Sequence, residues 1–278
     1  MVILDGKKVK EEILLELKSE VSKLSEKPHL VVIQVGDNEA SNIYIKQKEM
    51  MAREIGYEFT HLKFNTDITE EDLVCEIDKL NNDFSVHAIL VQMPLPNHID
   101  ANVIQNTIIP EKDVDGLSDI NTGKLFHNKD GLYSCTPYGV MELLRRYNIS
   151  VIGKHVVVVG RSNLVGKPMA ILLTNAGATV TICHSRTNDL KKYTMDADIL
   201  VVAVGKPKLI TEDMVKDGAV VIDVGITRLE NGLCGDVDFE KVSLKTSYIT
   251  PVPGGVGPMT VAMLGKNVLK AYKIQKNM

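Results

Sequence analysis

The feature of this chain that most limits its fold is a series of short, uninterrupted runs of branched apolar residues. Residues 29–35 read HLVVIQV, residues 198–204 read DILVVAV and residues 219–224 read AVVIDV. A strand with one face in water alternates apolar and polar residues, whereas continuous Val, Ile and Leu indicate burial on both faces. Segments with helical periodicity separate these runs. The pattern therefore predicts parallel sheets covered by helices, which is the α/β class.

The same reading predicts the order of elements along the chain. We expect strands at 29–35, 57–63, 87–92, 155–160, 178–183, 198–204 and 219–224, and helices at 6–25, 39–56, 70–83, 137–148, 164–176 and 259–274. The polar, turn-rich stretch 128–136 (NKDGLYSCT) is a natural break. The helix that follows it would bridge two α/β units.

Composition excludes several classes of function. A net charge of −4 without a dense Lys/Arg block argues against a nucleic-acid partner. No apolar run approaches a membrane span, and the start MVILDGKKVKEE becomes charged too early for a signal peptide. The 4 cysteines and 7 histidines are scattered, which predicts free thiols in a reducing, cytoplasmic compartment and no metal site.

A glycine-containing loop follows the four valines in residues 156–170 (VVVVGRSNLVGKPMA). It is not a Walker A loop, because Gly160 and Gly166 are one residue too far apart and Pro168 replaces the metal-binding hydroxyl. It is not a nucleophile elbow, because Leu164 stands where that turn needs a glycine. Two interpretations keep similar weight: a variant dinucleotide loop at a helix start, or an ordinary strand–loop–helix connection.

The next strand favours a dinucleotide, and NADP in particular. NAD-binding units place an acidic residue about 20 residues beyond the first glycine, where it binds the ribose 2′-hydroxyl. Here strand 178–183 is followed by Ser185 and Arg186, with no carboxylate before Asp189. Together with Arg161 on the loop, this hydroxyl and guanidinium suit a 2′-phosphate. A solvated polar turn is the alternative.

The first half of the chain carries a different kind of candidate. Tyr44 and Lys48 are four residues apart and share a helical face, which Met51 and Ile55 continue. A lysine on this apolar stripe could extend its amine to water or pair with a buried acid. The third interpretation is a desolvated amine with a lowered pKa, able to move protons.

Three further segments are candidates for ligand contact. Gln92 ends the strand at 87–92 and precedes a Pro-x-Pro segment that would form either a rigid ligand wall or an exit loop. Asp113 and Asp115 in PEKDVDGLSD offer a carboxylate for a polar ligand, or only a turn. The Gly/Pro-rich TPVPGGVGPMT (250–260) exposes backbone groups that could close around a flat ligand.

Taken in order, these motifs resemble one family along essentially the whole chain. ASNIYIKQK, VQMPLP, KDVDG, GRSNLVGKP, TVTICHSRT, IDVGI and PVPGGVGPMT are similar to the bifunctional methylenetetrahydrofolate dehydrogenase/methenyltetrahydrofolate cyclohydrolases. The resemblance implies two α/β domains with a cleft between them. Residues 1–136 plus 256–278 would form the catalytic folate domain, and residues 137–255 a Rossmann-like NADP domain. It also implies a cytosolic homodimer that acts on tetrahydrofolate one-carbon derivatives, in the metabolism that supplies purine, methionine and histidine biosynthesis.

The resemblance also implies a role for each candidate residue. Lys48 would be the central catalytic group, hydrogen-bonded to Gln92, with Tyr44 stacking on the folate rings and Asp115 binding the pterin edge. The segment from Pro253 through Gly254 and Gly255 to Thr260 would wall the folate. The cofactor-binding residues implied are Gly160, Arg161, Ser162, Ser185 and Ile226.

Three other functions are compatible with parts of this pattern. The first is a monofunctional NAD(P)-dependent methylenetetrahydrofolate dehydrogenase, against which the presence of Tyr44, Lys48, Gln92 and Asp115 argues. The second is a non-catalytic dinucleotide- or folate-binding protein, which would not need a poised lysine. The third is a Rossmann dehydrogenase for a small hydroxy acid, which would lack the PVPGGVGPMT segment.

Overall fold

The structure is a computed structural model that describes residues 1–229 and 232–278. The chain forms two compact α/β units, which confirms the predicted fold class. The first unit comprises Met1–Glu11 with Thr136–Thr260, and the second comprises Glu12–Cys135 with Val261–Met278. Among the described helices, none combines the length and the apolar character that crossing a membrane requires.

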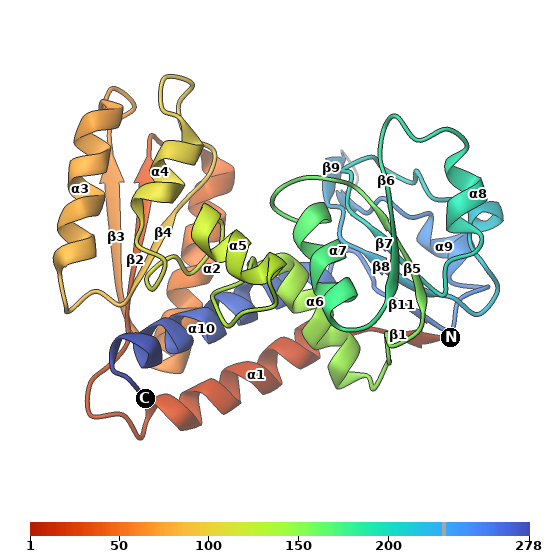
Figure 1. Ribbon diagram of the computed structural model, residues 1–278, viewed down its shortest axis with the longest axis horizontal. Helices are drawn as coiled ribbons and strands as arrows, with labels where there is room; N and C mark the ends of the chain where they lie inside the picture. Colours follow the sequence, from red (N-terminus) through yellow and green to blue (C-terminus); the bar gives the residue numbers. More distant parts are fainter. Residues whose placement is uncertain (230–231) are drawn as a thin grey trace. The chain divides into compact units, whose positions relative to one another are not determined.

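The second unit is built on a three-stranded parallel sheet in the order β3-β2-β4 (Figure 1). Its strands are β2 (His29–Val35), β3 (Glu58–Phe64) and β4 (Ala88–Val91). The central strand β2 is buried on both faces, as its continuous apolar sequence predicts. Its register places Val32 opposite His61 on one side and Leu90 on the other.

Helices cover both faces of this sheet. Helices α3 (Glu70–Asn82) and α4 (Ala101–Thr107) pack over one face, where Leu73, Ile77 and Ile104 join a buried core with alternate residues of β2 and β4. Helix α2 (Glu39–Ile55) packs against β2 and β3. Its Ile55 lies close to Gly265 of α10 (Val256–Gln275), where an added Cβ would lie 3.0 Å from Ile55 Cδ1.

Local sequence explains where these helices begin and end. The Asn38 side chain accepts a hydrogen bond from the Ser41 N–H and caps α2, and Thr69 caps α3 in the same way through the Asp72 N–H. Helix α2 ends at Gly56, whose φ of 98° is a left-handed conformation that glycine adopts without a steric penalty. Capping at both ends sets the length of the helix that carries Lys48.

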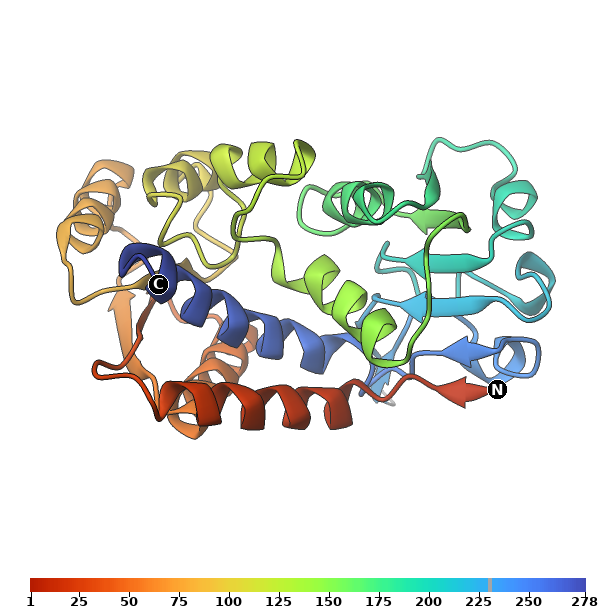
Figure 2. The same ribbon diagram turned by 60° about the horizontal axis from the view of Figure 1, so that its bottom comes forward.

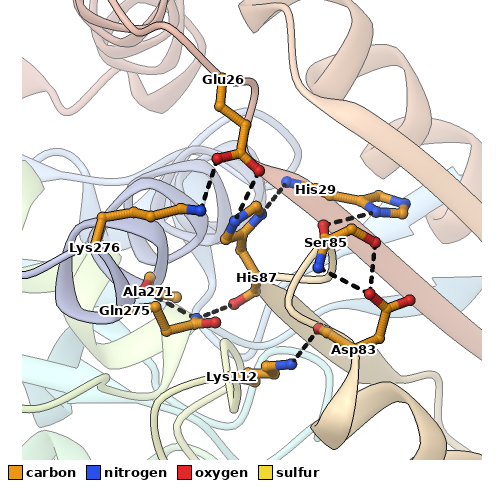
Figure 3. A network of polar contacts seen from close by, with 9 residues as sticks. All are labelled: Glu26, His29, Asp83, Ser85, His87, Lys112, Ala271, Gln275 and Lys276. Carbon is orange, nitrogen blue, oxygen red and sulfur yellow. Dashed lines mark hydrogen bonds and ion pairs between the residues drawn. The ribbon is translucent and has the colours of Figure 1, made fainter.

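A buried histidine lies at the start of β4. The Nδ1 atom of His87 accepts a hydrogen bond of 3.1 Å from the His29 N–H, so the neutral ring carries its proton on Nε2. Within the described part of the chain Nε2 has no hydrogen-bond partner, and the Glu26 carboxylate lies 3.8 Å away. Figure 3 shows this ring pointing toward Glu26, which Lys276 also binds at 2.7 Å. Burial lowers the pKa of His87 despite the Glu26 charge, and the charges of Lys276, His29 and Lys112 act in the same direction as burial.

This histidine predicts a pH dependence of stability. The pKa of His87 is lower in the folded protein than its ordinary 6.5, so the unfolded chain binds the proton more tightly. The free energy of unfolding should therefore fall as the pH drops through 6.5 toward the lower folded value. His87→Gln should flatten this fall in denaturant titrations between about pH 8 and pH 5. The part that remains comes from His61, whose pKa burial also lowers, and from Asp223, whose pKa burial raises to about 6 and which acts in the opposite direction. An unchanged slope would contradict the assignment.

The first unit contains a six-stranded, fully parallel sheet (Figure 2). Its strand order is β1-β11-β8-β7-β5-β6. The strands are β1 (Val2–Ile3), β5 (His155–Val159), β6 (Thr179–Cys183), β7 (Ile199–Val202), β8 (Val220–Asp223) and β11 (Tyr248–Ile249). After β5 the chain first adds β6 on one side, and then returns to add β7 and β8 on the other. The topological switch point therefore lies between β5 and β7, where open α/β sheets bind their ligands.

The remaining elements of this unit surround the sheet. They are α6 (Cys135–Arg146), α7 (Gly166–Asn175), α8 (Leu190–Thr194), the 3-10 turn η1 (Glu212–Met214), α9 (Phe239–Val242) and the hairpin of β9 (Thr227–Leu229) with β10 (Gly232–Cys234). On one face Leu200, Val202 and Val221 form a core with Val242 of α9. Helix α7 packs against β5 and β6.

The predicted helices and strands are all present. Their boundaries differ by a few residues, and further short elements lie between them. Helix α1 (Gly6–Val21) stops short of the expected residue 25, and α6 begins at Cys135, inside the stretch expected to be a break. Helices α4, α5 (Asp119–Phe126), α8 and α9, which are eight residues or shorter, were not predicted. The two-residue strands β1 and β11 were not predicted either. Segments this short do not complete enough turns or alternations to show a periodicity.

Candidate active site and cofactor loop

Lys48 and Gln92 meet at the carboxyl end of the smaller sheet. Lys48 lies on α2, Gln92 comes directly after β4, and the Lys48 Nζ donates to the Gln92 Oε1 at 2.8 Å. The Gln92 Nε2 donates to the Met93 carbonyl at 2.8 Å, so the amide presents its oxygen, an acceptor, to the lysine. The structure thus contains the hydrogen bond that the family resemblance implies.

A second contact ties α2 to the segment after β4. The Ser41 hydroxyl, one turn into α2, donates to the Met93 carbonyl at 3.2 Å. The buried Gln34 at the end of β2 donates to the Asn42 Oδ1 at 2.8 Å. These bonds hold the beginning of α2 against the ends of two strands, which places Lys48 relative to Gln92.

The two aspartates of the KDVDG motif have different roles. The Asp113 carboxylate is buried and accepts hydrogen bonds from the Gly116 N–H at 3.0 Å, the Ser118 N–H at 2.9 Å and the Asn121 amide at 2.9 Å. Asp113 therefore shapes the turn, as one of the two sequence interpretations stated. Asp115, at the centre of that turn, is left to face other groups.

Lys48, Asp115 and Cys135 form an electrostatic cluster. Burial lowers the pKa of Lys48, with the Asp115 charge opposing this effect. Burial raises the pKa of Asp115, with the Lys48 charge opposing. The Cys135 thiol is buried, and burial together with the Asp115 charge raises its pKa well above the ordinary value. Desolvation thus favours the neutral amine at Lys48. The sequence analysis did not find Cys135, because one thiol in SCT has no distinctive spacing.

Tyr44 is more exposed than a shared apolar stripe with Lys48 suggests. The buried residues of α2 are Ser41, Ile45, Met51, Ala52 and Ile55, whereas Tyr44 is 50% exposed. Lys48 is half-buried at the border of this stripe. The expected stripe is therefore correct at Met51 and Ile55 but does not extend to Tyr44, which lies on the exposed side of the helix. The exposed ring face of Tyr44 is free to contact a flat ligand.

The glycine loop after β5 lies at the switch point of the larger sheet. The Gly160 N–H donates to the Cys183 carbonyl at the end of β6, and a Cβ on Gly160 would lie 2.4 Å from the Ala203 carbonyl oxygen just after β7. A Cβ on Gly166, the first residue of α7, would lie 2.3 Å from the Gly160 oxygen. Only glycine permits this close approach of helix and loop, as in dinucleotide-binding turns.

The other cofactor candidates lie in this loop or follow other strands of the same sheet. The Ser162 hydroxyl accepts hydrogen bonds from the Val165 and Gly166 N–H groups at 3.2 and 3.4 Å, so it shapes the loop that leads into α7. Arg161 and Ser185 follow β5 and β6 with exposed side chains. Ile226 follows β8, is 45% exposed and lies beside Gly257, where an added Cβ would lie 3.4 Å from Ile226 Cδ1.

Two buried carboxylates hold the loops that follow the carboxyl ends of the strands in this sheet. Asp236 accepts hydrogen bonds from the Val204 and Gly205 N–H groups after β7, at 2.7 and 3.0 Å. Asp223 accepts from the Gly225 and Val237 N–H groups at 3.0 and 2.9 Å, and burial raises the pKa of Asp223 to about 6. Sequence reasoning missed both, although an acid at the end of a buried apolar strand (VVID) was a signal.

The PVPGGVG segment has a structural role as well as a proposed ligand role. The Gly254 carbonyl accepts the N–H groups of Gly6 and Lys7 at the start of α1, and a Cβ on Gly6 would lie 1.8 Å from the Gly255 oxygen. Pro253 is exposed. The glycines therefore permit a tight backbone contact with α1. This segment and the cofactor loop belong to the first unit, whereas Lys48, Gln92 and Asp115 belong to the second.

One α/β unit holds an amine against an amide, and the other contains a glycine loop of the kind that binds dinucleotides. This combination is typical of enzymes that bind a nucleotide cofactor in one unit and carry the reactive residues in another. Family models make the class specific. The catalytic domain of tetrahydrofolate dehydrogenase/cyclohydrolase matches residues 4–115, and the NAD(P)-binding domain of the same family matches residues 134–276. The chain belongs to the tetrahydrofolate dehydrogenase/cyclohydrolase family.

Individual relatives are similar over their full lengths. The bifunctional protein FolD of Nautilia profundicola is 54% identical, with 98% of each chain covered, and that of Campylobacter concisus is 52% identical, with 100% of each covered. The crystal structure of the bifunctional FolD enzyme from Campylobacter jejuni has a TM-score of 0.97 at 50% identity, covering 100% of this chain and 99% of that one. The Trypanosoma brucei enzyme, solved with NADP cofactor and inhibitor, has a TM-score of 0.94 at 39% identity, covering 100% and 99%. This protein is accordingly a bifunctional dehydrogenase and cyclohydrolase of folate-dependent one-carbon metabolism.

Proposed function

We propose that this enzyme oxidises 5,10-methylenetetrahydrofolate to 5,10-methenyltetrahydrofolate with NADP⁺ and then hydrolyses the methenyl cation to 10-formyltetrahydrofolate. The observation that carries the proposal is the Lys48 amine, desolvated and held at 2.8 Å by Gln92 within the residues that match the family's catalytic domain. The products would supply one-carbon units for purine, methionine and histidine biosynthesis.

The binding of the two ligands is divided between the two parts of the chain. The division expected from the sequence, a folate domain of residues 1–136 plus 256–278 and an NADP domain of residues 137–255, remains our proposal. The cluster of Lys48, Gln92 and Asp115 supports a reactive role for the former. The glycine cradle after β5 supports a cofactor role for the latter.

The cofactor loop fits a dinucleotide, since a side chain at Gly160 or Gly166 would collide with the Ala203 or Gly160 carbonyl oxygen, and glycine alone permits the tight strand–loop–helix turn of dinucleotide-binding units. When bound, NADP⁺ supplies the nicotinamide C4 that accepts the hydride. The N–H groups at the start of α7 would bind the pyrophosphate, with Ser162 shaping the loop. Arg161 and Ser185 would bind the 2′-phosphate, and Ile226 would pack against the nicotinamide. The hydride step needs chiefly alignment of two bound ligands.

Hydrolysis needs a group that moves protons, and Lys48 is suited to it. The neutral amine accepts a proton from the water that adds to the one-carbon bridge. The bridge carbon now carries a hydroxyl group, and the protonated amine returns its proton to N5 as the C–N5 bond breaks. The hydroxyl loses its proton to water as the formyl C=O forms, so the formyl group stays on N10 and one proton is released overall. Burial favours the neutral amine, and so does the positive charge of the substrate. Gln92 holds the amine in place through its Oε1.

Other residues bind the folate rather than react with it. We propose that Asp115 accepts hydrogen bonds from the amino-pyrimidine edge of the pterin and that Tyr44 stacks on the folate rings. Pro253, Gly254 and Gly255 are proposed to wall the folate. We also propose that the enzyme is a cytoplasmic homodimer, following the resemblance.

One assay tests the proposed function. The purified protein is mixed with 5,10-methylenetetrahydrofolate and NADP⁺, and the folate products are followed beside no-enzyme and NAD⁺ controls. We expect NADPH formation, followed by 10-formyltetrahydrofolate faster than uncatalysed hydrolysis produces it. Accumulating methenyltetrahydrofolate would leave only a dehydrogenase and remove the role of Lys48. Equal rates with NAD⁺ would remove the 2′-phosphate roles of Arg161 and Ser185.

A further inference from the structure

We propose that Asn267, on the last helix, is a positioning residue for Asp115. Its amide holds the turn of Asp115 in the orientation in which the carboxylate binds the pterin. The inference rests on the proposed function, in which Asp115 contacts the folate. Nothing in the motifs pointed to Asn267, although it interrupts the apolar stripe of α10 at a buried position.

The Asn267 side chain spans two segments far apart in the sequence. Its Nδ2 donates to the Val114 carbonyl at 2.8 Å and to the Tyr133 carbonyl at 2.9 Å, and it lies 3.6 Å from the Cys135 Sγ. Both amide hydrogens are therefore used. Asn267 is 1% exposed, and all four residues belong to the same compact unit.

The bond to Val114 acts directly on the backbone of Asp115. The Val114 carbonyl belongs to the peptide group that joins Val114 to Asp115, and that group is planar. Holding its oxygen in one direction therefore fixes the plane that contains the Asp115 nitrogen and Cα. This places the origin of the Asp115 side chain.

The bond to Tyr133 holds the other wall of the same turn. A Cβ on Gly116 would lie 2.5 Å from the Tyr133 carbonyl carbon, so the turn of Asp115 and the segment before Cys135 are in close backbone contact. Asp113 fixes the far end of the turn through the Gly116 and Ser118 N–H groups. Asn267 and Asp113 thus clamp the turn on both sides and leave Asp115 between them.

If α10 served only to bury an apolar face, it would not need an amide at residue 267. The neighbouring residues Met263, Leu264 and Val268 are buried and apolar, and a buried amide is unfavourable unless its hydrogen bonds are made. Leucine shares the branching of asparagine at Cγ but has no donor, so it would leave the Val114 and Tyr133 carbonyls without these hydrogen bonds. The amide at residue 267 therefore serves to hold these two carbonyls.

The test uses a graded series at residue 267. Asn267→Leu removes both donors, and Asn267→Ser keeps one donor and can be measured even where the leucine variant fails to fold. The readout is the Kd for tetrahydrofolate, which carries the pterin edge but no reactive one-carbon unit. We expect Asn267→Leu to weaken tetrahydrofolate binding roughly tenfold, Asn267→Ser to weaken it less, and the Kd for NADP⁺ to stay unchanged.

Gln275 provides a matched control on the same helix. Its Nε2 also donates to backbone carbonyls, those of His87 at 2.7 Å, Ala271 at 3.0 Å and Glu111 at 3.2 Å (Figure 3 shows the bonds to His87 and Ala271). Gln275→Leu should lower the free energy of unfolding without changing the Kd for tetrahydrofolate. An equal loss of folate binding in Gln275→Leu would overturn the inference, because it would reduce the effect at Asn267 to general destabilisation.

A double-mutant cycle separates this inference from the proposed function. If Asn267 acts through Asp115, adding Asn267→Leu to Asp115→Asn should change the Kd little beyond Asp115→Asn alone. A full, additive tenfold loss would overturn the positioning role while leaving Asp115 as a folate contact. If Asp115→Asn itself binds tetrahydrofolate normally, the proposed role of Asp115 is wrong, and the inference is overturned with it.

Discussion

Replacing Lys48 with methionine should abolish hydrolysis of 5,10-methenyltetrahydrofolate while leaving a folded protein. Methionine keeps the length and the apolar stem of the side chain but removes the amine that Gln92 binds. A positioned acid–base group contributes roughly 10²- to 10⁴-fold to a rate, so we expect a loss of about 10³-fold. The dehydrogenase rate should fall much less, because hydride transfer depends on alignment rather than on this amine.

Lys46 provides the control for charge and helix propensity. It lies on the same helix α2 with an exposed side chain. Lys46→Met removes the same charge and should leave both activities and the free energy of unfolding within experimental error. Hydrolysis that survives in Lys48→Met would assign the proton transfer to another group. A parallel loss in Lys46→Met would show that charge on α2, and not the poised amine, is what matters.

The pH profile separates a catalytic amine from a merely structural one. Burial lowers the pKa of Lys48 from its ordinary 10.5, and the neutral form is the one that accepts a proton. Hydrolysis of added 5,10-methenyltetrahydrofolate, corrected for the uncatalysed rate, should therefore rise with pH along one ionisation below 10.5. That ionisation should be absent from the residual activity of Lys48→Met.

The sheets could be predicted from the sequence because burial on both faces leaves a direct signature. The run HLVVIQV has nearly every position buried, so its composition alone marks β2 as a central strand. Strand β3 lies at the sheet edge and alternates partly exposed residues, yet its length of seven residues was enough to find it. The two-residue strands β1 and β11 carry no such pattern, and only their pairing beside β8 defines them.

The electrostatic cluster of Lys48, Asp115 and Cys135 was predictable only in part, because only some of its residues leave a pattern in the local sequence. Lys48 has a signal in its own helix, since a cation at the border of an apolar stripe is unusual. Asn267 has none, because its importance comes from the Val114 and Tyr133 carbonyls, which lie more than 100 residues away in the sequence. Cys135 has none, because its importance comes from its burial beside the charges of Asp115 and Lys48. The distinction between Asp113 and Asp115 depended on which carboxylate meets the N–H groups of the turn. Both lie in one short motif, and periodicity cannot separate them.

Placing a methyl group on Gly166 should weaken the dehydrogenase activity at limiting NADP⁺ and spare the hydrolase. The new Cβ would lie 2.3 Å from the Gly160 oxygen and 2.7 Å from the Arg161 nitrogen, which are backbone atoms with no flexible side chain to move aside. Gly166→Ala must therefore push α7 away from the loop after β5. Overpacking of this kind costs about 1–3 kcal/mol of stability. We expect the KM for NADP⁺ to rise at least about tenfold, because each 1.4 kcal/mol of lost binding is a factor of ten.

The control is a helical glycine with open space around it. Gly123 lies within α5, and an added Cβ there meets nothing within 4 Å, so Gly123→Ala tests the gain in helix propensity without a clash. It should leave the KM for NADP⁺ unchanged and stabilise the fold slightly. In Gly166→Ala, hydrolysis of supplied 5,10-methenyltetrahydrofolate should continue, because Lys48 and Gln92 belong to the other unit. Normal NADP⁺ binding in Gly166→Ala would show that the close approach of Gly160 and Gly166 serves the packing of α7 alone. Loss of both activities would show that the two reactions share more of the chain than a division into a cofactor unit and a folate unit allows.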